Sequence, residues 1–448
     1  MTSFNINIYL FLCIILLENF GYCDVTLHRK AKCSVPKDID HNERLSLLQK
    51  CISNKYNIGK DVPCYDELGC FPNDNPWVSI LRPFPSPLPP EDIETGIKLF
   101  TRKNSQGYSI TLWPKIDMRG SDFNPKRGAT VFVVHGFAAD GNDEWLKELK
   151  DTYLEKVDAN VFIVDWGEGA KLLNYLQVAS NTRIVGAELV RFGKHLIGLG
   201  LHPEKIHLIG HSLGAHIMSY MAKGIQSPSK IRRITALDPA QPGFEGASKD
   251  VKLTKGDAQY IDVIHTSAKP LIPFLGFGLM APAGDVDFYM NGGTTQPGCL
   301  LDIKLPNITS ILDLATFKVE VIAQWIACSH SRAYEYFIWS LKEPDCLMVG
   351  RKMNMIESIL KIKTLGVLGV FDPIIKKLQH CKLKTCTVLG FKTFKLEARG
   401  AFAVVTKPVE PFCDTPMDIT KKFKKVVEGI GGIISGTIGK VVSALHIF

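Results

Sequence analysis

From about residue 95 onward, short runs of apolar, β-branched residues alternate with stretches of helical periodicity. The runs that favour strands are TVFVVHGF (130–137), ANVFIVDWG (159–167), KIHLIGHS (205–212), ITALDPA (234–240) and YIDVIHT (260–266). The stretches 182–200 and 213–224 carry apolar residues every three or four positions, which favours helices. Near-continuous apolar strands that alternate with helices are typical of a parallel sheet covered on both faces. The pattern predicts an α/β protein with a mostly parallel central sheet and helices on both faces.

The first residues have the pattern of a secretory signal. The run IYLFLCIILL (8–17) is apolar but too short to span a bilayer, and small residues follow it. We therefore expect a signal peptide at 1–23, cleaved after Cys23, and a secreted, extracellular protein. A polar leader or propeptide-like extension follows at 24–62, which we expect Cys33–Cys51 to close.

The composition is that of a globular chain. The protein has 448 residues, of which 46% are hydrophobic and 22% charged, and a net charge of +8. This charge favours anionic partners such as lipid headgroups or sulfated glycans, and no motif supports nucleic acid. The twelve cysteines fit an oxidising compartment. Cys64–Cys70 and Cys381–Cys386 are close enough in sequence for local disulfides, and the absence of C-x-x-C leaves no basis for zinc.

The stretch HLIGHSLGAH (207–216) carries the candidate chemistry. Its Gly210-x-Ser212-x-Gly214 pattern fits a nucleophile elbow, a sharp strand-to-helix turn that exposes a serine hydroxyl. The serine follows a predicted strand and opens a predicted helix, which is the context that the motif requires. We therefore expect Ser212 to be a nucleophile.

A serine nucleophile needs a base, and the base needs an orienting acid. In this architecture the chain order is serine, acid, histidine. Asp238 ends the next predicted strand and is the favoured acid, with Asp262, Asp285 and Asp287 as weaker rivals. Two candidate histidines follow Asp238: one ends a predicted strand, and the other lies in a predicted loop after a cysteine. The spacing leaves both open, namely His265 and His330.

An oxyanion requires two backbone donors. The N–H of Leu213 lies next to the nucleophile, and the loop after an earlier strand offers the N–H of Phe137. His135 ends that strand, and we interpret it as a structural residue that braces the loop.

The motifs GHSLGAH, CYDELGCF, VHGF, VDW, RIVGAE, LDPAQPGF, DVIHT, GFG, DFYMNGG, QPGC and CSHSRAYEYF occur in one order. Together they resemble the animal pancreatic lipase family, densely over residues 62–340 and loosely over 380–413. The resemblance implies an α/β-hydrolase fold over 63–413 and hydrolysis of lipid esters without an organic cofactor. It gives the catalytic roles to Ser212, Asp238 and His330 rather than His265, and the oxyanion donors to Phe137 and Leu213.

The resemblance also implies a surface lid at 299–328, closed by a Cys299–Cys328 disulfide. The 28 residues between these cysteines are rich in large apolar side chains, and Asn307 begins an N-x-T glycosylation acceptor. A lid that turns such a face to lipid gains roughly 25 cal/mol per Å² removed from water. Because venom-type phospholipases A1 of the family have a much shorter lid, triacylglycerol is the expected substrate. The alternatives are a phospholipase A1 or galactolipase, and a non-catalytic lipid-binding or yolk-type protein.

Three departures from the family pattern matter. In the family, two backbone carbonyls and two aspartates form a calcium site. The carbonyl positions match Lys249 and Lys252 and one aspartate matches Asp257, but Thr254 stands at the position of the other aspartate, so a calcium site is doubtful here. The pattern ends near residue 413, where we also expect a Cys346–Cys413 disulfide, and no colipase partner is expected. Residues 414–448 form a basic amphipathic tail, which favours attachment to a membrane or lipoprotein surface.

Overall fold

The computed structural model describes residues 62–79, 82, 84–171, 174–270, 276–299, 319–343, 345–353, 382 and 384–414, and only the backbone of residues 319–326. The expected signal peptide, the leader up to residue 61 with Cys33–Cys51, and residues 300–318 of the lid with Asn307 lie outside the described residues. Cys381, residues 354–380 and residues 415–448 of the tail also lie outside them. Within the described ranges, no helix has the length and apolar character needed to cross a bilayer.

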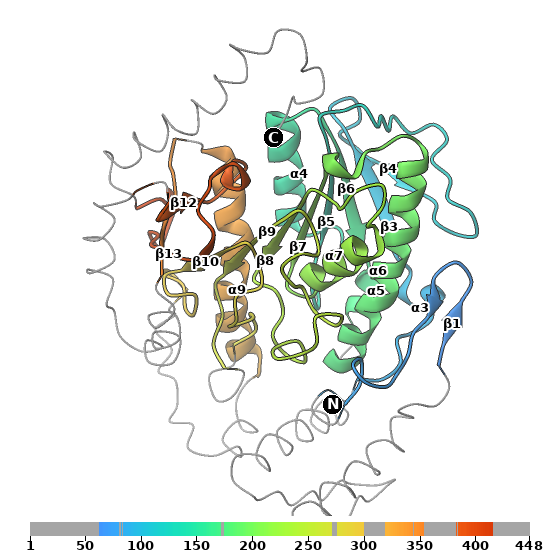
Figure 1. Ribbon diagram of the computed structural model, residues 1–448, viewed down its shortest axis with the longest axis horizontal. Helices are drawn as coiled ribbons and strands as arrows, with labels where there is room; N and C mark the ends of the chain where they lie inside the picture. Colours follow the sequence, from blue (N-terminus) through green and yellow to red (C-terminus); the bar gives the residue numbers. More distant parts are fainter. Residues whose placement is uncertain are drawn as a thin grey trace, which may run out of the picture.

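A twisted sheet of eleven strands runs through the centre of the described part of the chain (Figure 1). Its order is β12-β11-β13-β10-β9-β8-β7-β5-β6-β3-β4, and the strands from β13 to β6 in this order are parallel. Antiparallel pairs add β3 and β4 at one edge and β11 and β12 at the other. The strands span Gly96–Phe100 (β3), Tyr108–Ile110 (β4), Ala129–Val134 (β5), Ala159–Asp165 (β6), Ile206–His211 (β7), Arg233–Leu237 (β8), Tyr260–His265 (β9), Val286–Met290 (β10), Val349–Lys352 (β11), Cys386–Val388 (β12) and Gly400–Val404 (β13).

The five strands that the apolar runs predict are β5 to β9. Every residue of β5 is buried, because helices cover both faces of the sheet. Alternate side chains of this strand enter different cores: Phe132 packs edge-on against Phe192 of helix α6, with ring centroids 6.0 Å apart, whereas Val131 shares a cluster with Tyr153 of helix α4. The predicted fold class, an α/β protein with a mostly parallel central sheet, is confirmed.

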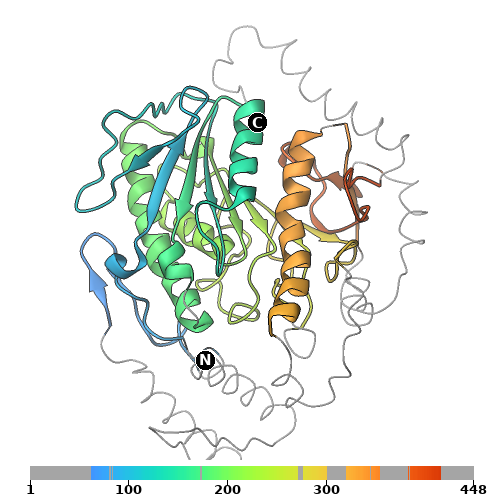
Figure 2. The same cartoon turned by 180° about the vertical axis from the view of Figure 1, so that it is seen from behind.

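Helices α6 (Tyr175–Gly198) and α7 (Leu213–Gly224) cover one face of the sheet, and α4 (Glu144–Lys156) and α9 (Val319–Lys342) cover the other (Figures 1 and 2). Helix α6 begins before the predicted stretch, because the side chain of Asn174 caps its first turn. The shorter helical segments are α3 (Pro90–Ile93), α5 (Gly167–Ala170), η1 (Pro203–Lys205) and η2 (Thr393–Lys395).

Three disulfides lie within the described residues, and each joins an expected pair. Cys64–Cys70 connects the small hairpin of β1 (Cys64–Tyr65) and β2 (Gly69–Cys70), Cys299–Cys328 joins the segment after β10 to α9, and Cys346–Cys413 joins segments near the sheet edge. Cys386 is also disulfide-bonded, and its expected partner lies outside the described residues.

Candidate active site

Ser212 stands between β7 and α7 in a backbone conformation that serine rarely adopts. Its φ is 57° and its ψ is −120°. Two glycines make this turn possible: a Cβ on Gly210 would lie 2.3 Å from the carbonyl oxygen of Gly214, and a Cβ on Gly214 would lie 2.6 Å from the Val134 side chain. A strained serine between a buried strand and a helix has the geometry of a nucleophile elbow.

The backbone of Ser212 is tied to the segment that carries the predicted acid. The N–H of Ser212 donates to the carbonyl of Leu237 at 3.0 Å, and the N–H of Ala240 donates to the carbonyl of Ser212 at 3.2 Å. These two bonds lie on either side of Asp238, which follows β8 with a φ of 44°. The serine and the carboxyl group are therefore held at the same end of the sheet, where the parallel strands β7 and β8 finish.

The carboxylate of Asp238 is fully buried and accepts several hydrogen bonds. Its Oδ1 accepts from the backbone N–H groups of Thr266 at 2.8 Å and Ser267 at 3.2 Å, and its Oδ2 accepts from the Ser267 hydroxyl at 2.5 Å and from His330 Nδ1 at 2.6 Å. Burial alone would raise the pKa of Asp238, but the bonds from His330, Ser267 and Thr266 outweigh burial and lower it. The sequence reasoning missed Ser267, although a polar residue directly after a strand at this end of the sheet is a usable signal.

His330 lies in helix α9, so the predicted loop at this position is wrong. Because a carboxylate can only accept, the 2.6 Å contact with Asp238 places the proton on Nδ1 and leaves Nε2 as the basic nitrogen. The segment is helical because buried residues recur every three or four positions and pack against the face of the sheet that α4 and α9 cover. These residues are Ala333, Tyr336, Phe337, Ile338 and Leu341.

Within the described residues no hydrogen bond joins the Ser212 hydroxyl to His330. The two residues are connected through His211, whose Nε2 donates to the backbone carbonyl of His330 at 3.1 Å and whose ring centroid lies 4.4 Å from that of His330. Catalytic hydrogen bonds are often long without a ligand and shorten in the substrate complex. The structure thus joins Asp238 to His330 directly and places Ser212 beside them.

The loop after β5 reaches the serine. A Cβ on Gly136 would lie 2.7 Å from the Cβ of Ser212 and 3.2 Å from its hydroxyl oxygen, so no larger residue fits there. In the described part of the chain, neither the N–H of Phe137 nor that of Leu213 donates a hydrogen bond, and Leu213 opens helix α7, where N–H groups lack helical partners. Two free backbone donors therefore flank the serine.

His135 braces this loop, as the sequence suggested. Its Nε2 accepts a hydrogen bond from the backbone N–H of Trp166 at 3.2 Å, and the Trp166 indole stacks on its ring with centroids 5.6 Å apart. Asp165 lies 3.5 Å from the same nitrogen and accepts a hydrogen bond from the backbone N–H of Gly167 at 3.0 Å. These contacts tie His135 to the segment that follows β6.

The rival candidates have other partners. Nε2 of His265 contacts Asp287 at 3.0 Å inside the core; burial lowers the pKa of His265, but the bond to Asp287 outweighs burial and raises it. Asp262 forms a buried bidentate pair with Arg233, with both contacts at 2.8 Å. Asp285 accepts from a backbone N–H of β9 at 3.0 Å. These residues stabilise the sheet rather than the serine.

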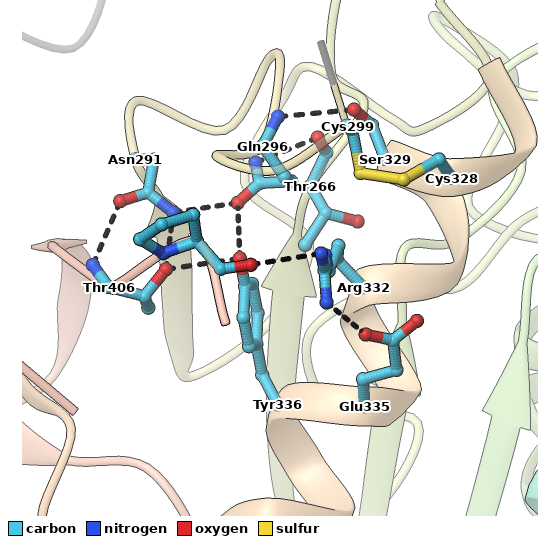
Figure 3. The surroundings of a disulfide bond; sticks show 11 residues. Thr266, Asn291, Gln296, Cys299, Cys328, Ser329, Arg332, Glu335, Tyr336 and Thr406 are labelled. Atoms are coloured by element: carbon cyan, nitrogen blue, oxygen red, sulfur yellow. Dashed lines mark hydrogen bonds and ion pairs between the residues drawn. A yellow bond between two sulfur atoms is a disulfide. The ribbon is translucent and has the colours of Figure 1, made fainter. Parts of the chain in front are cut away.

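The helix that carries His330 is anchored beside the Cys299–Cys328 disulfide (Figure 3). The N–H of Gln296 donates to the Ser329 hydroxyl at 3.1 Å, and the Tyr336 hydroxyl donates to the Gln296 side chain at 3.2 Å. Figure 3 shows these polar groups gathered around the start of the described part of α9. The sequence reasoning did not identify Gln296, although it belongs to the QPGC motif that ends at the disulfide.

The residues expected at a calcium site do not fit a calcium ion. The carboxylate of Asp257 and the carbonyl of Lys252 lie together, but both accept hydrogen bonds from the ammonium of Lys223, each at 2.8 Å. Thr254 donates to the same carbonyl at 3.2 Å, and Lys249 is exposed. Among the described residues, no group of three or more His, Cys, Asp or Glu side chains could hold a metal.

The lipase family model matches residues 61–364. Pancreatic lipase-related protein 2 of Rattus norvegicus is 40% identical over 291 residues, which cover 64% of this chain and 60% of that protein. The protein of the same name from Mus musculus is 38% identical over 77% of this chain and 67% of its own length. Pancreatic triacylglycerol lipase of Homo sapiens is 38% identical over 64% of this chain and 60% of its own length. The match thus spans roughly three fifths to two thirds of these relatives.

A solved esterase from Thermogutta terrifontis overlaps with 37% of this chain and 74% of its own, at 15% identity and a TM-score of 0.26. The order of parallel strands, the serine turn after β7 and the family match define an α/β-hydrolase. The chain belongs to the lipase family, within the animal pancreatic lipases.

Proposed function

We propose that this protein is a secreted lipase that hydrolyses carboxylic ester bonds of lipids. The observation that carries the proposal is the 2.6 Å hydrogen bond from His330 Nδ1 to Asp238, made at the end of the sheet where the strained Ser212 follows β7. The disulfides among the described residues and the expected signal peptide support secretion.

In the proposed reaction, the Ser212 oxygen attacks the ester carbonyl carbon while His330 Nε2 takes the hydroxyl proton. The tetrahedral oxyanion accepts hydrogen bonds from the N–H groups of Phe137 and Leu213. Collapse of this intermediate expels the alcohol, which receives the proton from His330, and leaves the acyl group on Ser212. Water then repeats the sequence and releases the fatty acid.

Asp238 has an electrostatic role in this scheme. The buried carboxylate fixes the orientation of the His330 imidazole and stabilises the imidazolium that forms when Nε2 is protonated. Each oxyanion donor contributes on the order of 10²–10³ in kcat in well-studied hydrolases. No metal or organic cofactor takes part in a step of this scheme.

Triacylglycerol is the proposed substrate. Relatives named pancreatic triacylglycerol lipase support this choice, as does the length of the segment between Cys299 and Cys328. The disulfide brings the two ends of that segment to a Cα–Cα distance of 5.6 Å, directly before His330. By the family resemblance, an apolar lid of this length would cover the active site in water and meet a lipid surface.

A substrate comparison tests the proposal. Triolein emulsion, phosphatidylcholine liposomes and a galactolipid dispersion are assayed with the purified protein, with Ser212→Ala as the blank. Fatty-acid release from triolein that exceeds release from the other two supports the proposal. Turnover of phospholipid or galactolipid without triolein would show a phospholipase or galactolipase instead. Equal rates for the wild type and Ser212→Ala would show that the protein binds lipid without hydrolysing it.

A further inference from the structure

Lys223, in the last turn of helix α7, points its ammonium into the loop that precedes β9. Nζ donates to the Ser219 hydroxyl oxygen at 2.5 Å, to the Lys252 carbonyl at 2.8 Å and to the Asp257 carboxylate at 2.8 Å. An ammonium has three N–H donors. All three are therefore used, and each meets an oxygen.

The carboxylate oxygen that faces Lys223 accepts three hydrogen bonds. Oδ2 of Asp257 accepts from the ammonium, from the Ser219 hydroxyl at 2.7 Å and from the backbone N–H of Thr254 at 2.9 Å. Asp257 is buried, and one ammonium balances its one charge. A calcium ion takes six to eight oxygen ligands and favours several carboxylates. This loop carries two carboxylates, Asp250 and Asp257, and among the described residues only Asp257 bonds directly to the ammonium, which occupies the position facing it. Asp250 is exposed and acts on Lys223 at longer range.

Hydrogen bonds connect this loop to the candidate active site. The N–H of Leu253 donates to Nδ1 of His216 at 3.1 Å, and Nε2 of His216 donates to the carbonyl of Ala240 at 2.9 Å. Ala240 in turn donates to the carbonyl of Ser212. A cation that fixes this loop therefore supports the backbone on which Ser212 and Asp238 lie.

We infer that the ammonium of Lys223 is a built-in cation: it takes the place that the family resemblance gives to calcium, and it makes the fold independent of that metal. The helix supplies the positive charge, and the loop supplies a carbonyl and a carboxylate to hold it. The threonine at position 254 fits this arrangement: one ammonium carries one positive charge, so the carboxylate of Asp257 balances it without a second aspartate.

Thermal unfolding of the full chain tests the inference. The Tm of the wild type is expected to stay the same in millimolar EDTA and in millimolar calcium chloride. Lys223→Met, which keeps the length of the side chain but leaves Asp257 unpaired, is expected to lower the Tm by roughly 5 °C or more. The matched control is Lys252→Met, which removes an ammonium from the same loop and keeps the bonded carbonyl; its Tm is expected to stay near that of the wild type.

A double variant completes the test. Lys223→Met with Thr254→Asp removes the ammonium and restores a second carboxylate, so added calcium chloride is expected to raise its Tm. A wild-type Tm that falls in EDTA and recovers with calcium would overturn the inference, and this measurement needs no variant. Equal Tm values for Lys223→Met and the wild type would overturn it as well.

Discussion

The imidazole of His211 holds the backbone of His330: Nε2 of His211 donates to the carbonyl of His330 at 3.1 Å, and the two rings lie 4.4 Å apart. Burial, followed by the nearby His330, lowers the pKa of His211 to about 3, so His211 is neutral at physiological pH. The residue next to the proposed nucleophile is therefore a neutral donor that positions the proposed base.

Loss of this donor is expected to slow catalysis. His211→Phe keeps a ring between strand β7 and helix α9 but cannot donate, so we expect kcat to fall about tenfold with little change in KM. Steady-state kinetics on a soluble ester measure this, and thermal unfolding checks the fold. His211→Gln retains an N–H donor and should recover part of the rate. Equal kcat values for His211→Phe and the wild type would remove the positioning role.

The close approach of Gly136 to Ser212 leads to a second prediction. The Cβ of Gly136→Ala would lie 2.7 Å from the Cβ of Ser212, so the serine or the loop that carries the Phe137 N–H must move. We expect kcat to fall by roughly 10²-fold or more. Gly96→Ala is the control, because its Cβ would meet the nearest atom at 3.8 Å, an ordinary contact. Similar rates for both variants would argue against the proposed oxyanion site.

The Ser267 hydroxyl donates to the same oxygen of Asp238 that His330 contacts. Ser267→Ala removes one of the hydrogen bonds that lower the pKa of Asp238, so the pKa of that carboxyl group is expected to rise. The acid limb of the kcat/KM profile is therefore expected to move to higher pH by roughly half a unit to one unit. The control is Thr266→Val, because the buried Thr266 hydroxyl has no partner in the described part of the chain. Superimposable profiles for Ser267→Ala and the wild type would contradict the prediction.

The titration of the buried Glu188 of α6 is expected to make the folding stability of the protein depend on pH. Burial raises the pKa of Glu188 to about 7, although the Trp113 indole N–H donates to it at 2.8 Å. Because its folded pKa lies above its unfolded value, the folded state binds the proton more tightly. The resulting stabilisation is complete below the unfolded pKa, near 4.5, and is lost as the pH rises through about 7.

Glu188→Gln removes this titration. Relative to the wild type, the variant is expected to gain up to roughly 3 kcal/mol between about pH 5 and about pH 8, the energy equivalent of a shift from 4.5 to about 7. Urea unfolding at both pH values measures the difference. The exposed Glu204→Gln is the control. A constant difference in unfolding free energy between Glu188→Gln and the wild type at the two pH values would show that Glu188 is not the titrating group.

The sheet could be predicted because its central strands are buried on both faces and are therefore continuously apolar. The serine turn could be predicted because Gly210 and Gly214 meet backbone atoms that no larger residue would clear. Strands β10 and β13 were not predicted. Their pairing joins segments far apart in the sequence.

The roles of the site residues could not all be predicted from the sequence, because they depend on partners that lie far away along the chain. Spacing could not separate His265 from His330, because the distinction lies in their partners: His265 faces Asp287, whereas His330 faces Asp238. Likewise, a lysine at the end of an amphipathic helix predicts a solvated side chain. The role of Lys223 emerges when the fold brings the loop of Asp257 against that helix end.

The most direct test of the proposed chemistry is active-site labelling with a fluorophosphonate, with the modified residue located by peptide mass spectrometry. The wild type is predicted to be labelled at Ser212 alone, Ser212→Ala not at all, and His330→Ala at least roughly 10²-fold more slowly because its serine lacks a base. Folded wild-type protein that is not labelled, or is labelled on another serine, would contradict the assignment of Ser212, Asp238 and His330.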